Sequence, residues 1–166
     1  MIRPASGAAL AALLLAASGV SRAQSTAPLD LASFPRAALE IVQQRQGQPP
    51  HRFHFDVWVA DTQPRAEQGL MFVHELPAAR GMVFPFSPPR VEAMWMKNTY
   101  IELDILFIGA DGHVVKITER ARPLSLETLS SDVPVGAVLE LKGGEAQHLG
   151  LRIGDQVSWK LTAAAP

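Results

Sequence analysis

Six consecutive residues near the middle of the chain bring together several kinds of side chain that are able to bind a ligand. Residues 94–99 read Met-Trp-Met-Lys-Asn-Thr, so two thioethers, an indole, an ammonium and a carboxamide lie close together. A single carboxylate, Asp104, follows inside the apolar run 103–108. An indole face stacks on sugars and other planar groups, and a few polar groups around it fix the orientation of such a ligand. We therefore predict a ligand-binding site formed by Trp95, Lys97, Asn98 and Asp104.

Asp104 also has a structural interpretation. A carboxylate buried among apolar residues is costly unless it is ion-paired or hydrogen-bonded. Asp104 would then accept hydrogen bonds from Asn98, Thr99 or backbone N–H groups and hold the turn between two strands. The sequence leaves both interpretations open.

The methionines at 94 and 96 suggest a copper site. On an extended strand Met94, Met96 and Asn98 share one face, while Trp95 and Lys97 share the other. Thioethers suit Cu(I), but methionine is also a common filler of apolar cores. Copper handling therefore ranks third among the functions considered. The five histidines show no ligand spacing, and no metal or cofactor is assigned.

The sequence contains no contiguous catalytic motif. It has neither the Gly-x-Ser-x-Gly elbow of many hydrolases nor a glycine-rich phosphate loop. We expect a non-catalytic binding or accessory domain for a small molecule, a glycan or a partner protein. The alternative is a hydrolase or transferase whose site is assembled from separated residues, and no catalytic residue is assigned.

The N-terminal segment has the pattern of a secretory signal peptide. Arg3 precedes a short apolar run at residues 8–17, and Ser21-Arg22-Ala23 fits a signal-peptidase site. The apolar run is too short for a transmembrane helix, which needs roughly 18 or more residues. We expect cleavage after Ala23 and a periplasmic or secreted protein with no remaining membrane span.

Composition limits the classes of partner. Removal of 23 of the 166 residues leaves 143, a length that suits one domain. The remaining 13 basic and 16 acidic residues give a net charge of −3, so we expect no nucleic-acid partner. The sequence has no cysteine, which excludes thiol chemistry and leaves stability to packing and hydrogen bonding.

Hydrophobic periodicity predicts a mostly β (α+β) fold. After a tether at 24–38, residues 39–162 form a single domain, either a compact β-barrel or a rolled sheet of seven or eight short strands. Hairpin signals argue against a parallel βαβ fold, and Asp111-Gly112 predicts a two-residue type I′ turn. A helix at 37–46 is the alternative to the first strand. We expect a surface loop at 119–135, two short helices at 63–68 and 145–149, and strands at 39–41, 53–59, 81–86, 91–97, 103–109, 113–118, 137–141 and 157–161.

Seven motifs occur in a characteristic order: QGLMF at 68–72, GMVF at 81–84, WMKNT at 95–99, LDILFI at 103–108, DG at 111–112, VLEL at 138–141 and GD at 154–155. Over roughly residues 50–161 the chain resembles the prokaryotic family called domain of unknown function 192. The resemblance implies a small β-rich domain, often exported, and implies no activity. Members often carry proline where this chain has Glu102, and many carry cysteines in the loop where this chain has residues 125–135. Any function or crosslink of those cysteines is absent here.

Overall fold

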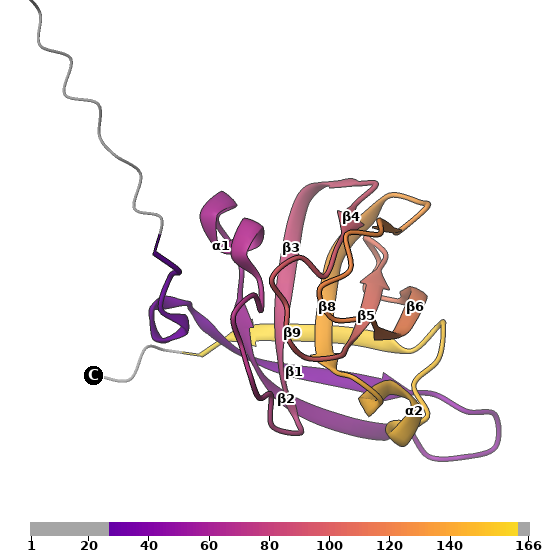
Figure 1. Ribbon diagram of the computed structural model, residues 1–166. Helices are drawn as coiled ribbons and strands as arrows, with labels where there is room; N and C mark the ends of the chain where they lie inside the picture. The colour runs from indigo at the N-terminus through magenta and orange to yellow at the C-terminus, as the bar shows by residue number, and fades with distance from the viewer. Residues whose placement is uncertain (1–26, 163–166) are drawn as a thin grey trace, which may run out of the picture.

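The computed structural model describes residues 27–162, which form one mostly β domain of nine strands and two α-helices. The expected signal peptide at 1–23 lies outside these residues. Figure 1 shows the elements in chain order. They are a short 3₁₀ turn η1 (Leu31–Ser33), β1 (Arg36–Gln43), β2 (His51–Val59), α1 (Gln63–Gln68), β3 (Arg80–Arg90), β4 (Ala93–Met94), β5 (Leu103–Ile108), β6 (Val114–Ala121), β7 (Leu129–Ser130), β8 (Val135–Lys142), α2 (Glu145–Leu149) and β9 (Gln156–Leu161).

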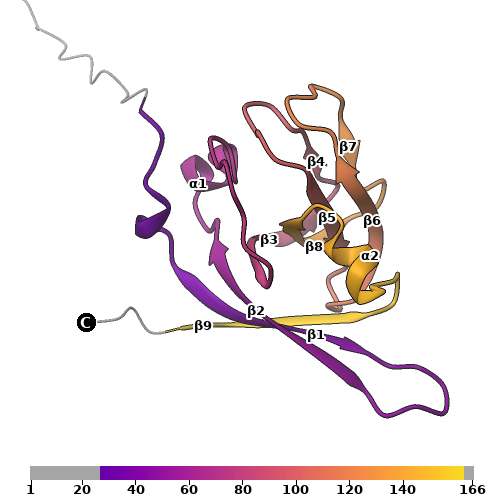
Figure 2. The ribbon, with the colours of Figure 1, turned by 60° about the horizontal axis from the view of Figure 1, so that its bottom comes forward.

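Seven strands form one sheet in the order β6-β5-β8-β3-β2-β1-β9, and β4 pairs with β7 in a small second sheet. In Figures 1 and 2, β1, β2 and β9 cross the direction of β3, β8 and β5, so the sheet is strongly rolled. Its two edge strands approach each other at one end, where His113 bridges Gln156 and the Val114 N–H donates to the Asp155 carbonyl at 2.9 Å. The sheet does not close into a barrel, which confirms the rolled-sheet alternative.

One pairing in the large sheet is parallel. β2 and β3 run in the same direction, with Asp56 opposite Arg80 and Val59 opposite Val83, and α1 lies on the connection between them. The hairpin signals of the sequence gave no indication of this local βαβ unit. The other pairings in the sheet are antiparallel, so the fold as a whole is not of the parallel class.

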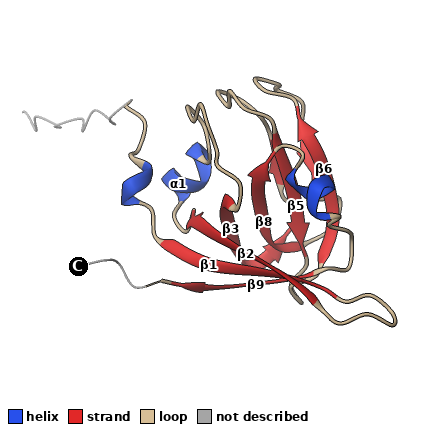
Figure 3. Cartoon of the chain, turned by 90° about the horizontal axis from the view of Figure 1, so that it is seen from below, coloured by secondary structure: helices blue, strands red, loops and turns tan. Residues whose placement is uncertain are grey.

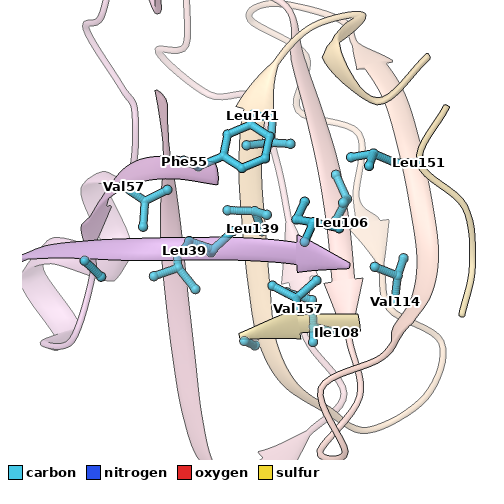
Figure 4. Packing of buried hydrophobic residues seen from close by; sticks show 14 of the residues in the cluster. Leu39, Phe55, Val57, Leu106, Ile108, Val114, Leu139, Leu141, Leu151 and Val157 are labelled. Carbon is cyan, nitrogen blue, oxygen red and sulfur yellow. The ribbon is translucent and has the colours of Figure 1, made fainter. Parts of the chain in front are cut away.

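An inner core fills the roll of the sheet. Figure 4 shows Leu39, Phe55 and Val57 from one side of the roll facing Leu139 and Leu106 from the other. Strand alternation supplies these contacts, because β1 and β2 turn every second side chain inward. α2 lies beside this core, to which it contributes Ala146.

An outer core covers the opposite face of the central strands. Met82, Phe84, Ile105, Phe107 and Val138 point to this side and pack against residues of the loops that cross it. β5 is therefore buried on both faces along its whole length, which explains its nearly continuous apolar sequence. α1 and α2 lie at opposite ends of the domain, as Figure 3 shows.

The prediction of a strand at 91–97 is wrong for most of these residues. Only Ala93 and Met94 pair, with β7. The Met96 N–H donates to the Ser125 carbonyl outside any ladder, and Asn98 has a positive φ of 55° that turns the chain. Contacts with a segment distant in sequence therefore override the local preference for a strand.

Three other boundaries differ from expectation. β3 continues to Arg90 through Ser87-Pro88-Pro89, because its register with β8 is interrupted between Pro85 and Arg90 and the prolines need no ladder partner there. The turn after β5 is not type I′, since Gly112 has a positive φ and Asp111 does not. A longer loop forms, in which the Gly109 N–H donates to the His113 carbonyl. The expected loop at 119–135 contains the end of β6 and all of β7.

The domain begins before residue 39. β1 starts at Arg36, and both Phe34 and Ala37 are buried. Residues assigned to the tether therefore belong to the packed domain, and the alternative helix at 37–46 does not form. The two helices form at the expected residues, 63–68 and 145–149. No helix within residues 27–162 has the length and apolar character needed to cross a bilayer.

Candidate functional site

Trp95 and Lys97 lie together on the surface. The indole is 50 % exposed, and the Lys97 ammonium lies 5.2 Å from the centroid of its ring. That distance is within the range of a cation–π contact. Trp95 follows directly after the short strand β4, so the ring is held where the chain leaves the small sheet.

Asn98 has a local structural role. Its backbone carbonyl accepts from the Phe72 N–H at 2.9 Å, and its side-chain amide lies 3.9 Å from the Met71 sulfur. Its positive φ is one that asparagine tolerates better than most residues. Asn98 therefore joins its own loop to the segment that follows α1.

Asp104 lies on the other face of the sheet from the outer core. It is opposite Leu141, an inner-core residue, whereas Ile105 is opposite Glu140 on the outer side. The Asp104 side chain is fully buried and accepts from three backbone N–H groups: Arg120 at 2.8 Å, Gly144 at 3.0 Å and Ala146 at 2.7 Å. These bonds fasten the start of α2 and the end of β6 to β5. The structure does not bring Asp104 together with Trp95, Lys97 and Asn98.

A groove of about 820 Å³ borders Trp95. It runs between α1 and the segment from Pro85 to Trp95, and its lining combines polar and apolar side chains, with Phe86 and Trp95 as the aromatic members. A second, much smaller cavity of about 30 Å³ lies next to it. Ala66, Glu67 and Trp95 line both, so the cavity continues from the groove toward the sheet.

Glu140 lies at the inner end of this cavity. Its side chain is 4 % exposed, and its Oε2 atom has no hydrogen-bond partner. Burial raises the pKa of Glu140 to about 8, and the backbone N–H of Leu70 lowers it only in part. The carboxyl group is therefore protonated at neutral pH. A raised pKa in a concave site is a recognised mark of functional groups, although structural groups also show it.

Sequence reasoning did not select Glu140. The signal that drew attention to Asp104, a carboxylate inside an apolar strand, is equally present in the run Val138-Leu139-Glu140-Leu141. What the sequence does not reveal is that β8 turns Glu140 toward the loops carrying Gly69 and Trp95. An added Cβ at Gly69 would lie 3.7 Å from the Glu140 Oε2.

Separate sequence motifs converge on the cavity. Its lining includes Gln68 to Met71 from the segment after α1, Phe84 from β3, Trp95 and Thr99 from the 95–99 loop, and Glu140 from β8. Four of the seven motifs that carry the family resemblance therefore meet at one place. The remaining lining residues are Ala66, Glu67 and Met94.

The methionines occupy different environments. Met96 is buried in the outer core, Met94 lines the small cavity, and Met71 faces the Asn98 amide. Within residues 27–162 no group of three or more histidine, aspartate or glutamate side chains is placed to hold a metal ion. Copper binding through Met94 and Met96 stays a prediction.

Comparison with known proteins gives a family and a fold. The family model DUF192, described as an uncharacterised ACR, matches residues 39–159. A crystal structure of a candidate transcription regulator from Sinorhizobium meliloti 1021 is similar at 35 % identity and a TM-score of 0.71, over 76 % of this chain and 95 % of that one. A protein of unknown function from Novosphingobium aromaticivorans DSM 12444 is similar at 39 % identity and a TM-score of 0.67, over 73 % and 84 % of the two chains. No curated protein matches the chain.

Proposed function

The chain belongs to the DUF192 family, whose description assigns no activity, and from its geometry we propose that it is an exported, non-catalytic domain that binds a carbohydrate chain in the groove beside Trp95. The observation that carries this proposal is the half-exposed indole at the rim of a groove of about 820 Å³. Binding sites for small ligands have volumes of roughly 300–1,000 Å³.

The lining of the groove suits hydroxyl-rich ligands. The groove lining offers hydrogen-bond acceptors at Asp61, Gln63, Glu67 and Ser87. Gln63 and Glu67 lie on α1 and Ser87 lies on β3, so a ligand in the groove would have acceptors on both sides. Arg90 also lines it and is held in place by Glu92, with 2.7 Å between its Nε and the carboxylate. An aromatic face surrounded by such groups binds one face of a pyranose ring by stacking and its edges by hydrogen bonds.

A partner protein is the second candidate. Exposed apolar side chains lie on the loops that are linked to the 95–99 segment and on their neighbours, and a contiguous surface of this kind marks an interaction site. Hydrogen bonds connect these loops, from the Phe72 N–H to Asn98 and from the Leu124 N–H to Thr99. The exposed residues are Phe72, Val91, Trp95, Tyr100, Leu124, Leu126 and Val133. A hydrolase or transferase activity stays an untested alternative.

Glycan-array binding of the purified protein tests the main proposal. Trp95→Ala removes the platform without opening the core, so we expect it to fold normally and to lose about tenfold or more in affinity for a bound glycan. Tyr100→Ala is the matched control, because Tyr100 is 43 % exposed and does not line the groove. Equal glycan affinities for the parent and Trp95→Ala, or no glycan bound by the parent, would overturn the carbohydrate proposal.

Export has its own test. Cell fractionation followed by N-terminal sequencing should place the protein outside the cytoplasm with Gln24 as its first residue. Retention of residues 1–23 in the purified protein would overturn export by the proposed signal peptide.

A further inference from the structure

We propose that the small cavity behind Trp95 is a subsite for an ammonium group of the ligand, with Glu140 as its counter-ion. This inference rests on the proposed function, because the groove must deliver the ligand to the cavity. It narrows the ligand class from carbohydrates in general to carbohydrates that carry free amino groups.

The size of the cavity fits a small polar group. A buried water needs roughly 10–15 Å³ of such space, so about 30 Å³ holds one or two groups of that size. An ammonium group, which is close to a water molecule in size, fits this space, whereas a sugar ring does not. The ring would remain in the groove, where Trp95 lines both spaces.

Glu140 provides an unused contact. The Oε2 atom is buried without a partner, and leaving such an atom unsatisfied costs roughly 1–3 kcal/mol. Neighbouring elements do not relieve it: β3 turns Met82 and Phe84 to this side, and β5 places Ile105 opposite. A ligand group that reaches the cavity therefore supplies a hydrogen bond that the protein itself lacks.

The charges around the cavity favour a cation. Its lining contains two carboxyl groups, Glu140 and Glu67, and no lysine, arginine or histidine. Glu67 accepts from the neutral amide of Gln63 at 2.8 Å rather than from a basic group. The Lys97 ammonium lies 5.2 Å from the centroid of the Trp95 ring but is not among the residues that line the cavity. An anionic ligand group would be repelled by Glu67 at the same place.

Binding of an ammonium group would release one proton. At neutral pH the free protein carries Glu140 as the carboxylic acid, because burial raises its pKa to about 8. A carboxylate is the stronger partner for an ammonium, so the acid gives its proton to solvent as the ion pair forms. No covalent bond is made or broken other than this O–H bond. Glu67 is the other titratable side chain that lines the cavity. The strands next to Glu140, β3 and β5, turn apolar side chains toward this side of the sheet.

Calorimetry with two matched ligands tests the subsite. The chitosan trimer carries amino groups at positions where cellotriose carries hydroxyls. We expect the parent protein to bind the chitosan trimer about tenfold or more tightly than cellotriose at about pH 5.5, where the amino groups of the free trimer are protonated. Comparison of two buffers with different ionisation enthalpies should show release of about one proton for the chitosan trimer and none for cellotriose.

Glu140→Gln should remove both signals. Glutamine resembles the protonated acid in shape, so the variant should fold, bind cellotriose as the parent does, and lose both the preference for the amino trimer and the proton release. Glu127→Gln, at an exposed position away from the groove, should behave as the parent. Equal affinity of the parent for both trimers without proton release overturns the subsite and leaves the groove proposal intact. If the parent binds neither trimer, the subsite is overturned, and so is the choice of these two sugars as ligands of the groove.

A measurement on the parent protein needs no variant. Carbon-detected NMR titration of the Glu140 carboxyl should show a lower pKa in methylammonium chloride than in sodium chloride at equal ionic strength. An identical Glu140 pKa in the two salts would contradict the assigned ion pair.

Discussion

Replacement of Glu140 by glutamine should change how stability depends on pH. The pKa of this carboxyl is about 8 in the folded protein because of burial, against an ordinary value of 4.5. Between these values the folded state holds a proton that the unfolded state has released. Raising the pH over this range therefore favours the unfolded state, and the stability contributed by protonated Glu140 is lost as pH approaches the folded value.

The size of the effect follows from the two pKa values. Each pH unit between them changes the free energy of unfolding by about 1.4 kcal/mol. From about pH 5 to pH 8, the parent should therefore lose roughly 3–5 kcal/mol relative to Glu140→Gln, which has no titrating group at this position. The difference should be small below about pH 4, where Glu140 is protonated in both the folded and the unfolded parent.

Urea unfolding followed by far-ultraviolet circular dichroism provides the measurement. The free energy of unfolding of both proteins is determined at several pH values from about 5 to 9. Asp111 and Asp132, whose pKa values are lowered by hydrogen bonds from His113 and Lys116 respectively, titrate in both proteins, so their contribution cancels in the difference. Parallel stability curves for the two proteins would refute the desolvation of Glu140 and the raised pKa with it.

Three further substitutions test the internal contacts, each by urea unfolding. Asp104→Asn should lower the free energy of unfolding by roughly 2–4 kcal/mol, because one carboxylate oxygen becomes an NH₂ that cannot accept a hydrogen bond from a backbone N–H. The control Glu102→Gln, at an exposed site, should lower it much less, and equal losses would contradict the role of Asp104. Gly81→Ala should destabilise the protein by about 1–3 kcal/mol or prevent folding, since the added Cβ would lie 2.4 Å from the Glu140 carbonyl oxygen. Unchanged stability would show that β3 and β8 are less closely paired than described. Asp155→Asn should lower the free energy of unfolding by roughly 2–4 kcal/mol, because the buried carboxylate accepts hydrogen bonds from Arg45 at 2.6 Å and from the Arg152 N–H at 2.8 Å. Stability equal to that of the parent would contradict this role of Asp155.

The sequence predicted elements whose signals are local. The helix at 63–68 follows from Thr62 before it, Pro64 in its first turn and Gly69 after it, and the structure confirms its bounds. The Thr62 side chain makes no capping hydrogen bond, so proline and glycine carry that prediction. The alternation at 53–59 likewise predicted most of β2.

The sequence did not predict features that depend on distant partners. Residues 91–97 have strand-like composition, but the bond from the Met96 N–H to Ser125 removes them from any long ladder. The candidate site shows the same division. Trp95 was recognisable by its type and neighbours, whereas the importance of Glu140 depends on which loops cross the outer face of β8. The partners of Asp104 were equally hidden, because they are backbone groups of β6 and the start of α2.

The pairing of β1 with β9 determines when the growing chain can complete its sheet. Ala37 lies opposite Leu161, so the first strand of the sheet waits for the last one. During synthesis the inner core stays uncovered on one side until residues 156–161 are available, so the sheet cannot be completed before these residues have been made. A chain that remains incompletely folded while it grows is also easier to thread through a translocation channel. Under the export proposed above, the pairing of β1 with β9 would therefore leave the nascent protein incompletely folded during translocation.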